Sequence, residues 1–207
     1  MPQQVARRRG GETRREILDA AVEVMGERGV AGLSLSEVAR RVGVRQPSLY
    51  KHFPSLHAVY DELFRAGAER QRDDVARAVR DSAPGLAALT AAIEALGRNA
   101  MAGPVVAQLL SWRPVPEFEP SAAAMRPSIE MVEIIRGTLK DAVAAGELDP
   151  AADSDEGVAL VSIVVSGALT QQLANEPKAG YETGRFSSLL PRAFDMFVRY
   201  FAPKTEV

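Results

Sequence analysis

The stretch LSLSEVARRVGVRQPSLYKHF, residues 33–53, contains two sets of helix signals separated by a glycine. Ser34 and Glu37 form a capping box, in which each side chain accepts a hydrogen bond from the other residue's backbone N–H. A helix is therefore expected to begin at this point. Gly43 is expected to end it after about two turns, because glycine readily adopts the left-handed conformation that closes helices.

A second short helix is expected from Gln46 to Phe53. Pro47 lacks an N–H and has a fixed φ, so it suits the first turn of a helix, and Pro54 cannot continue that helix. The segment is too polar for a core helix. Leu49 and Phe53 lie four residues apart and can anchor one face in a core, which leaves donors and acceptors on the other face.

A longer helix is expected before these two. Thr13 and Glu16 form another capping box, and Gly29 can end the helix. Its apolar stripe consists of Leu18, Ala21, Val22 and Met25. One long helix followed by two short ones around a tight turn is typical of the helix-turn-helix motif, whose last helix lies in the major groove of DNA. The alternative is a compact helical corner whose aromatic residues belong to the core.

The charge distribution favours a polyanionic partner for this amino-terminal part. Residues 1–53 hold ten Lys or Arg and six Asp or Glu, a charge of +4, and residues 54–207 hold fifteen and twenty-one, a charge of −6, which together give the net −2 of the chain. A basic segment on an acidic body suggests nucleic acid binding. An uneven solvated surface is the alternative that charge alone leaves open.

The span from Thr13 to about Val59 resembles the DNA-binding domain of the TetR (tetracycline repressor) family of bacterial regulators, on the first-helix stripe, LSLSEVARRVGV at 33–44 and SLYKHF at 48–53. The resemblance implies an all-α homodimer that binds a palindromic DNA operator. It also implies a set of DNA contacts, namely Arg14, Ser34, Arg45, Gln46, Pro47, Ser48, Tyr50, Lys51 and His52. Arg45 stands where the family commonly has a capping serine or threonine, and Leu56 stands where it often has a lysine.

About nine helices are expected over the whole chain, with no strands, because apolar residues recur mostly at helical spacing. Residues 1–12 are expected to be a flexible basic arm, whose Arg7, Arg8 and Arg9 either enter a minor groove or form a solvated tail. Residues 13–54 are expected to form the helix-turn-helix domain. Residues 55–207 are expected to form a ligand-binding and dimerisation domain, joined to it by a helix at 55–81.

Several soft or large apolar side chains in this larger domain are candidates for the wall of an effector cavity. They are Met101, Leu109, Trp112, Phe118, Met125, Ile129 and Met131. Core packing is the alternative for each of them. No basic cluster accompanies them, so we expect a small apolar effector.

The last two expected helices are apolar over more of their surface than one core face requires, and we expect them to pair with a second copy as a four-helix interface. The candidate interface residues are Ile163, Leu169, Leu173, Leu190, Phe194 and Phe197. Burial within one chain is the alternative. Residues 157–175 carry no charge but are diluted by polar residues and are barely long enough to span a bilayer, so no membrane partner is expected.

No catalytic residue, metal ligand or cofactor is expected. The chain has no cysteine, which excludes disulfides and thiolate metal sites and fits a cytoplasmic protein. Its two histidines, His52 and His57, lie five residues apart, which does not suit a metal pair on one helix face. The sequence therefore predicts a homodimeric, sequence-specific transcriptional regulator, most simply a repressor that an apolar effector releases. A constitutive DNA-binding protein with a solid core is the alternative, followed by a helical enzyme.

Overall fold

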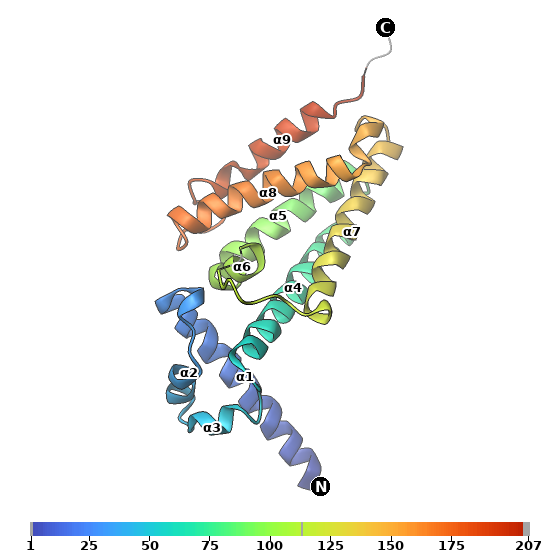
Figure 1. The fold of residues 1–207 in the computed structure, drawn as a ribbon. Helices are drawn as coiled ribbons and strands as arrows, with labels where there is room; N and C mark the ends of the chain where they lie inside the picture. Colours follow the sequence, from blue (N-terminus) through green and yellow to red (C-terminus); the bar gives the residue numbers. More distant parts are fainter. Residues whose placement is uncertain (1, 113, 205–207) are drawn as a thin grey trace.

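The computed structural model describes residues 2–112 and 114–204, with side chains from residue 11 onward, and within this part of the chain it is all-α with no strand. The all-α prediction is confirmed, and the described part contains nine α-helices (Figure 1). Their bounds are α1 Pro2–Arg28, α2 Leu35–Val42, α3 Gln46–Leu49, α4 Leu56–Arg80, α5 Leu86–Ala102, α6 Pro104–Ser111, α7 Ala122–Ala144, α8 Asp155–Asn175 and α9 Leu190–Tyr200. Short 3-10 helices lie at η1 Val30–Gly32, η2 Pro150–Ala152 and η3 Ser187–Leu189.

The amino-terminal domain, formed by α1, η1, α2 and α3, follows most of the predicted helix signals. The Ser34 hydroxyl accepts a hydrogen bond from the Glu37 N–H at 3.3 Å, and this cap begins α2. Gly43 ends α2 in the left-handed conformation, with φ of 73°. The glycine matters here because a side chain at this φ is strained.

Two predicted boundaries in this domain were wrong. The backbone of α1 is helical from Pro2, so the capping box at Thr13 and Glu16 lies inside the helix and does not begin it. Residues 2–12 of the expected arm thus form the first turns of α1, and the predicted role of Arg7–Arg9 lies outside the residues whose side chains are described. The helix α3 ends at Leu49 instead of Phe53, because residues 50–52 form turns that return the chain toward α4.

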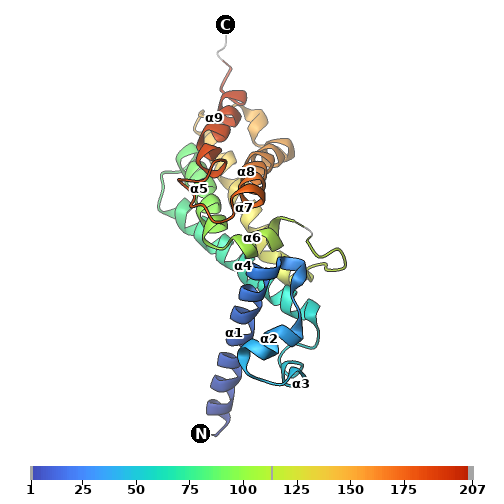
Figure 2. The same ribbon diagram turned by 90° about the vertical axis from the view of Figure 1, so that its left-hand side faces the viewer.

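The body of the molecule consists of α4 to α9. The long α4 leaves the amino-terminal domain and continues into the body, as Figure 1 shows. Ser55 caps α4 by accepting a hydrogen bond from the Ala58 N–H at 3.1 Å. The helix α7 begins at Ala122, where the Ser121 hydroxyl accepts a hydrogen bond from the Ala124 N–H at 3.2 Å, and it contains Pro127. Figure 2 shows the elongated molecule, with α6 between the amino-terminal domain and the body.

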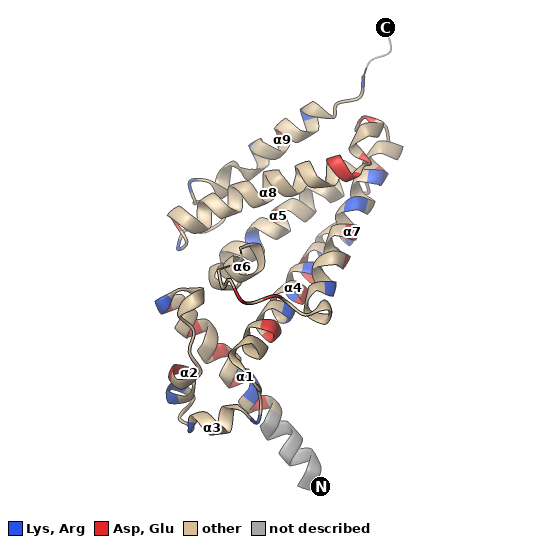
Figure 3. Ribbon diagram, in the orientation of Figure 1, with Lys and Arg blue, Asp and Glu red and all other residues tan. Residues whose placement is uncertain are grey.

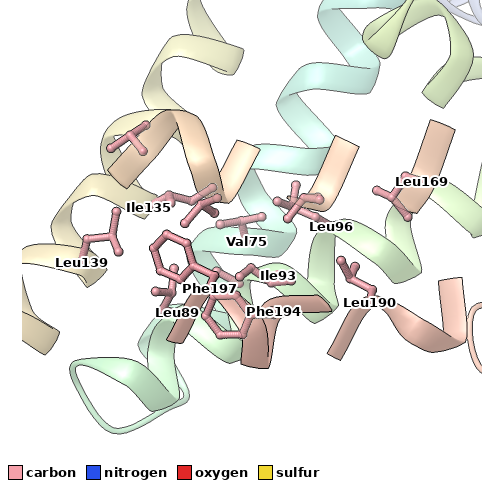
Figure 4. Packing of buried hydrophobic residues seen from close by; sticks show 14 of the residues in the cluster. Val75, Leu89, Ile93, Leu96, Ile135, Leu139, Leu169, Leu190, Phe194 and Phe197 are labelled. Carbon is pink, nitrogen blue, oxygen red and sulfur yellow. The ribbon is translucent and has the colours of Figure 1, made fainter. Parts of the chain in front are cut away.

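The buried apolar side chains form two clusters. The head cluster contains side chains of α1, η1, α2 and α3, and it continues into α4, α6 and the start of α7. The body cluster joins α5, α7, α8 and α9 to the second half of α4, and Figure 4 shows part of it around Ile93 and Phe197. Because α4 supplies side chains to both clusters, it holds the two parts of the molecule in one arrangement.

Among the described helices, α8 is the one that is long and apolar enough to cross a membrane by length and composition. It packs against α5, α6, α7 and α9. Within the fold it therefore has neighbours on most of its length, as expected for a helix of the packed body.

Candidate nucleic-acid interface

The end of the amino-terminal domain presents a row of polar side chains to solvent. Most of the predicted contacts are exposed, namely Arg45, Gln46, Pro47, Tyr50 and Lys51, and Ser34, Ser48 and His52 are half-buried. Beneath them Leu49 and Phe53 are each 1% exposed and anchor the segment in the head cluster. The predicted division between an inward apolar side and an outward polar side is thus present in the fold.

The side chains of Arg45 and Lys51 make no hydrogen bond or ion pair with any described residue, so their charges are available to an anionic partner. Arg45 also precedes α3 without capping it through its side chain. Two free cations beside exposed donors and acceptors suit duplex DNA, in which phosphates lie next to base edges.

Three other arginines of the domain are occupied by acidic residues, which the sequence analysis did not foresee. The Glu37 carboxylate lies 2.7 Å from Arg40, 3.4 Å from Arg28 and 3.5 Å from Arg41. The hydrogen bond from Arg40 lowers the pKa of Glu37 to about 2, helped by the charge of Arg28. Arg41 also pairs with Glu27 of α1, so this network fixes α2 on α1.

Arg14 has a structural role that differs from its predicted contact with DNA. Its guanidinium donates to the His52 carbonyl at 2.9 Å, pairs with Glu62 at 3.1 Å, and lies 4.2 Å from the centre of the Phe53 ring. These contacts tie α1 to the segment after α3 and to α4. Arg14 therefore positions the exposed row, and its charge is already compensated.

A buried hydrogen bond fixes α4 to the amino-terminal domain. The Tyr60 hydroxyl donates to the Val30 carbonyl at 2.6 Å, and both residues are buried. Burial raises the pKa of the Tyr60 hydroxyl, so it stays a donor over the ordinary pH range. This hydrogen bond, together with the Arg14–Glu62 pair, sets the orientation of the domain relative to α4.

A cavity of about 300 Å³ lies between α4, α6, the loop that follows α6 and the start of α7. Four of the predicted cavity residues line it, namely Leu109, Trp112, Phe118 and Met125. The other three do not. Met101 and Met131 pack against the body cluster, and Ile129 is 57% exposed because it lies on the outer face of α7.

Five of the six residues predicted for the dimer interface lie inside the single chain and not on its surface. Leu169, Leu173, Leu190, Phe194 and Phe197 are at most 6% exposed within the single chain, because the inner faces of α8 and α9 complete the body cluster. Only Ile163 is exposed, at 63%.

The outer faces of α8 and α9 carry apolar side chains that the sequence analysis missed. Met196 and Tyr200 of α9 are 72% and 70% exposed. Figure 3 shows that α8 is almost free of charge beyond its first turn. Once the buried set is assigned, helical spacing identifies these residues as lying on the opposite face.

No group of three or more His, Asp or Glu side chains that could hold a metal ion occurs among the described residues. In the amino-terminal domain Glu23, Glu27 and Glu37 pair with arginines instead.

Comparison with known proteins agrees with this geometry. Residues 17–63 match the family model described as bacterial regulatory proteins, tetR family. The chain is 38% identical over 71 residues to the uncharacterized HTH-type transcriptional regulator YobS of Bacillus subtilis (strain 168), a match that covers 34% of this chain and 37% of that protein. It is 29% identical over 187 residues to the tetracycline repressor protein class A from transposon 1721 of Escherichia coli, which covers 87% of this chain and 79% of that one.

The fold also matches solved structures. The TetR family transcriptional regulator PfmR from Thermus thermophilus superimposes with a TM-score of 0.69 at 19% identity, over 91% of this chain and 99% of that one. At this identity the match supports the fold alone. Residues 17–63, which run from α1 into α4, thus match the tetR family of bacterial regulatory proteins, and the fold is similar over nearly the whole length to that of a solved TetR family regulator.

Proposed function

We propose that the chain is a homodimeric, sequence-specific DNA-binding regulator of transcription, and that a small apolar effector releases it from its operator. The observation that carries the proposal is the exposed row from Arg45 to Lys51, held on the buried Leu49 and Phe53. Sequence-specific hydrogen bonds to base edges require polar side chains that are held in place by a rigid apolar core. We propose repression as the mode of regulation, because it requires only that the protein bind its operator.

Selection of duplexes from a random pool tests the DNA-binding part. We expect enrichment of a palindromic sequence whose two half-sites lie about 34–36 Å apart, since a symmetric dimer presents two copies of the row. The affinity should fall steeply with salt, because Arg45 and Lys51 displace counterions from phosphates. A pool that remains random after repeated selection at low salt would contradict the proposal.

The cavity favours an effector over a constitutive DNA-binding protein with a solid core. Its volume of about 300 Å³ is at the lower end of the range for small-molecule sites. A thermal shift with neutral apolar compounds, followed by release of the selected duplex, separates the two functions. The constitutive alternative predicts no shift and no release.

The outer faces of α8 and α9 are the proposed dimer interface. Ile163, Met196 and Tyr200 form an exposed apolar surface there, far from the amino-terminal domain in Figure 1. An Ile163→Asp substitution should give a monomer in light scattering, because two carboxylates would be buried across the symmetric contact. Ile129→Asp is the matched control, since Ile129 is a similarly exposed isoleucine on α7 and should leave the dimer intact.

Two further consequences follow from DNA as the partner. A regulator of this kind acts where the chromosome is, so a cytoplasmic location is part of the proposal. Catalysis is not part of it, because the polar groups of the site are displayed on a surface and the described lining of the cavity between α4, α6 and α7 has no ionisable side chain that could act as a base.

A further inference from the structure

The cavity is built on the head cluster and only touches the body cluster. Among its walls Phe64, Leu109 and Phe118 are buried members of the head cluster. Leu110, Val115 and Met125 pack against the same cluster, and Trp112 is the one lining residue that packs against the body cluster. A molecule that fills the cavity therefore presses on the side chains that support the amino-terminal domain.

Phe118 provides the first direct connection to that domain. Its ring lies 5.5 Å from the Tyr60 ring, and the Tyr60 hydroxyl donates to the Val30 carbonyl at 2.6 Å. Val30 belongs to η1, between α1 and α2, and is 4% exposed. Since all three residues are buried and closely packed, displacement of Phe118 cannot be absorbed without a shift at Val30.

Asp61 provides the second connection. Its carboxylate accepts hydrogen bonds from the Ser121 N–H at 2.7 Å and from the Ser121 hydroxyl at 2.9 Å. Ser121 is also the cap of α7. The loop that forms one cavity wall is therefore clamped to α4 one residue after Tyr60.

We infer that the segment 114–121 transmits occupancy of the cavity to the amino-terminal domain, with Tyr60 and Asp61 as positioning residues that touch neither effector nor DNA. The inference rests on the proposed function, because it concerns how that same site is regulated. Tyr60 and Asp61 do not line the cavity and do not belong to the exposed row. Substitution of both residues should leave effector binding and DNA binding intact but remove the effect of one on the other.

The lining also defines the chemical class of the effector. The described lining residues include no ionisable side chain. The Trp112 ring N–H is already donated to the Thr170 hydroxyl at 3.2 Å, which leaves Ser111 and Ser128 as the polar side chains of the wall. Among the described residues a charged group would find no partner in this wall, so we expect a neutral, compact apolar effector with one or two hydrogen-bonding groups.

A substitution that fills the cavity tests the transmission without any effector. Ser128→Phe adds a ring to the cavity from α7 and should weaken binding to the selected duplex by about tenfold or more, as a coupling of ordinary size would. Ile129→Phe is the matched control, because it places the same ring one residue further, on the outer face. Ser128→Leu serves as a smaller filler if the phenylalanine variant does not fold.

The filler is then combined with Tyr60→Phe and Asp61→Ala in a double-mutant cycle. Tyr60→Phe removes only the bond to Val30, and Asp61→Ala removes the clamp on Ser121. In the combined background, the chain that carries both Tyr60→Phe and Asp61→Ala, the filler should change duplex affinity by less than about twofold, which is within the usual limits of additivity. Glu69→Ala is the control for loss of a carboxylate from α4, since Glu69 pairs with Arg65 and not with the loop.

A neutral probe tests the class of effector. Trp112 is the only tryptophan and lines the cavity, so its fluorescence reports binding directly. We expect 2-naphthol to quench it and 2-naphthoate to bind at least about tenfold more weakly, because the carboxylate finds no partner. In Tyr60→Phe/Asp61→Ala, 2-naphthol should still quench Trp112 but should no longer release the duplex.

Hydrogen exchange of residues 33–53 gives a readout that needs no DNA. Filling the cavity should speed exchange there in the parent chain and not in the combined background, because local opening of the domain follows the loss of its support. A filler effect that persists in full in the combined background, in both duplex binding and exchange, overturns the inference. Failure to select any duplex overturns the proposed function instead, and exchange still decides the inference.

Discussion

The two apolar clusters support two different kinds of surface. The head cluster is covered on its outer side by polar side chains such as Gln46 and Lys51, which are held in place but not bonded. The body cluster is covered by α8 and α9, whose outer faces still carry apolar side chains such as Ile163 and Met196. A polar surface suits a charged partner, and an apolar one suits a second protein surface.

The difference indicates which part of the chain needs a permanent partner and which part can remain exposed to solvent. The amino-terminal domain can remain exposed to solvent without a partner, because its surface side chains are polar and well solvated. The body exposes Ile163, Met196 and Tyr200 to water at a cost, which favours permanent pairing of the body and reversible binding by the amino-terminal domain.

The largest expected effect comes from truncating one leucine in each cluster. Leu49→Ala and Leu139→Ala each remove a fully buried side chain and should lower the free energy of unfolding by about 2–5 kcal/mol. Because α4 contributes to both clusters, each variant should shift one common transition when denaturation is followed by circular dichroism and by Trp112 fluorescence. Two separate transitions would mean that the clusters unfold independently.

In the amino-terminal domain, the roles of individual residues could be predicted from the sequence. The cap at Ser34, the left-handed Gly43 and the buried pair Leu49 and Phe53 were all predicted and are present. These features are local, since each depends on residues within one or two turns. The role of Arg14 was missed because its partners His52 and Glu62 are distant in sequence, and nothing in the pattern of α1 indicates them.

In the body, the helices could be predicted from the sequence, but not which face of each helix is buried. The helix α8 is apolar nearly all round, so periodicity does not distinguish the side that packs on the body from the side that faces outward. Leu169 and Leu173 were therefore assigned to the interface although they are core residues. Of the seven side chains predicted for the cavity, Leu109, Trp112, Phe118 and Met125 line one, because they lie in or beside the loop that joins α6 to α7.

Two substitutions in the exposed row should sharpen the distinction between base reading and phosphate binding. Gln46→Ala should cost about 1–3 kcal/mol with the selected duplex and relax its preference at one position, because an amide that reads a base edge is lost. Lys51→Ala should weaken binding to all duplexes alike and reduce the salt slope by about one. Fluorescence anisotropy titrations at several salt concentrations measure both. Identical behaviour of the two variants would show that the row carries no sequence preference.

A smaller effect is expected from Arg14, which supports the row without facing outward. Arg14→Gln should weaken duplex binding by roughly threefold to tenfold and leave the salt slope unchanged, because a charge-assisted hydrogen bond within the domain is lost and no phosphate contact is. Arg15→Gln removes the same charge from the next residue, which is exposed. If Arg14→Gln reduces the salt slope as Lys51→Ala does, Arg14 binds phosphate after all.

The smallest effect concerns the arginine network around Glu37. The pKa of Glu37 is lowered to about 2 from an ordinary value of 4.5, chiefly by the hydrogen bond from Arg40. A lowered pKa in the folded state contributes stability above the unfolded value, and this contribution is lost as the pH falls from 4.5 toward 2. Thermal unfolding should therefore show the parent chain becoming less stable over this interval.

In Glu37→Gln the loss over the same interval should be smaller, since a neutral amide does not titrate. Glu27 and Glu62, whose pKa values are also lowered, would still contribute to the slope in both chains. The network is exposed enough for solvent and salt to weaken it, so the difference between the two curves should shrink further in high salt. Parallel curves at low salt would mean that Glu37 gains little from folding, and that α2 is held on α1 by the buried Val38 and Ala39 instead.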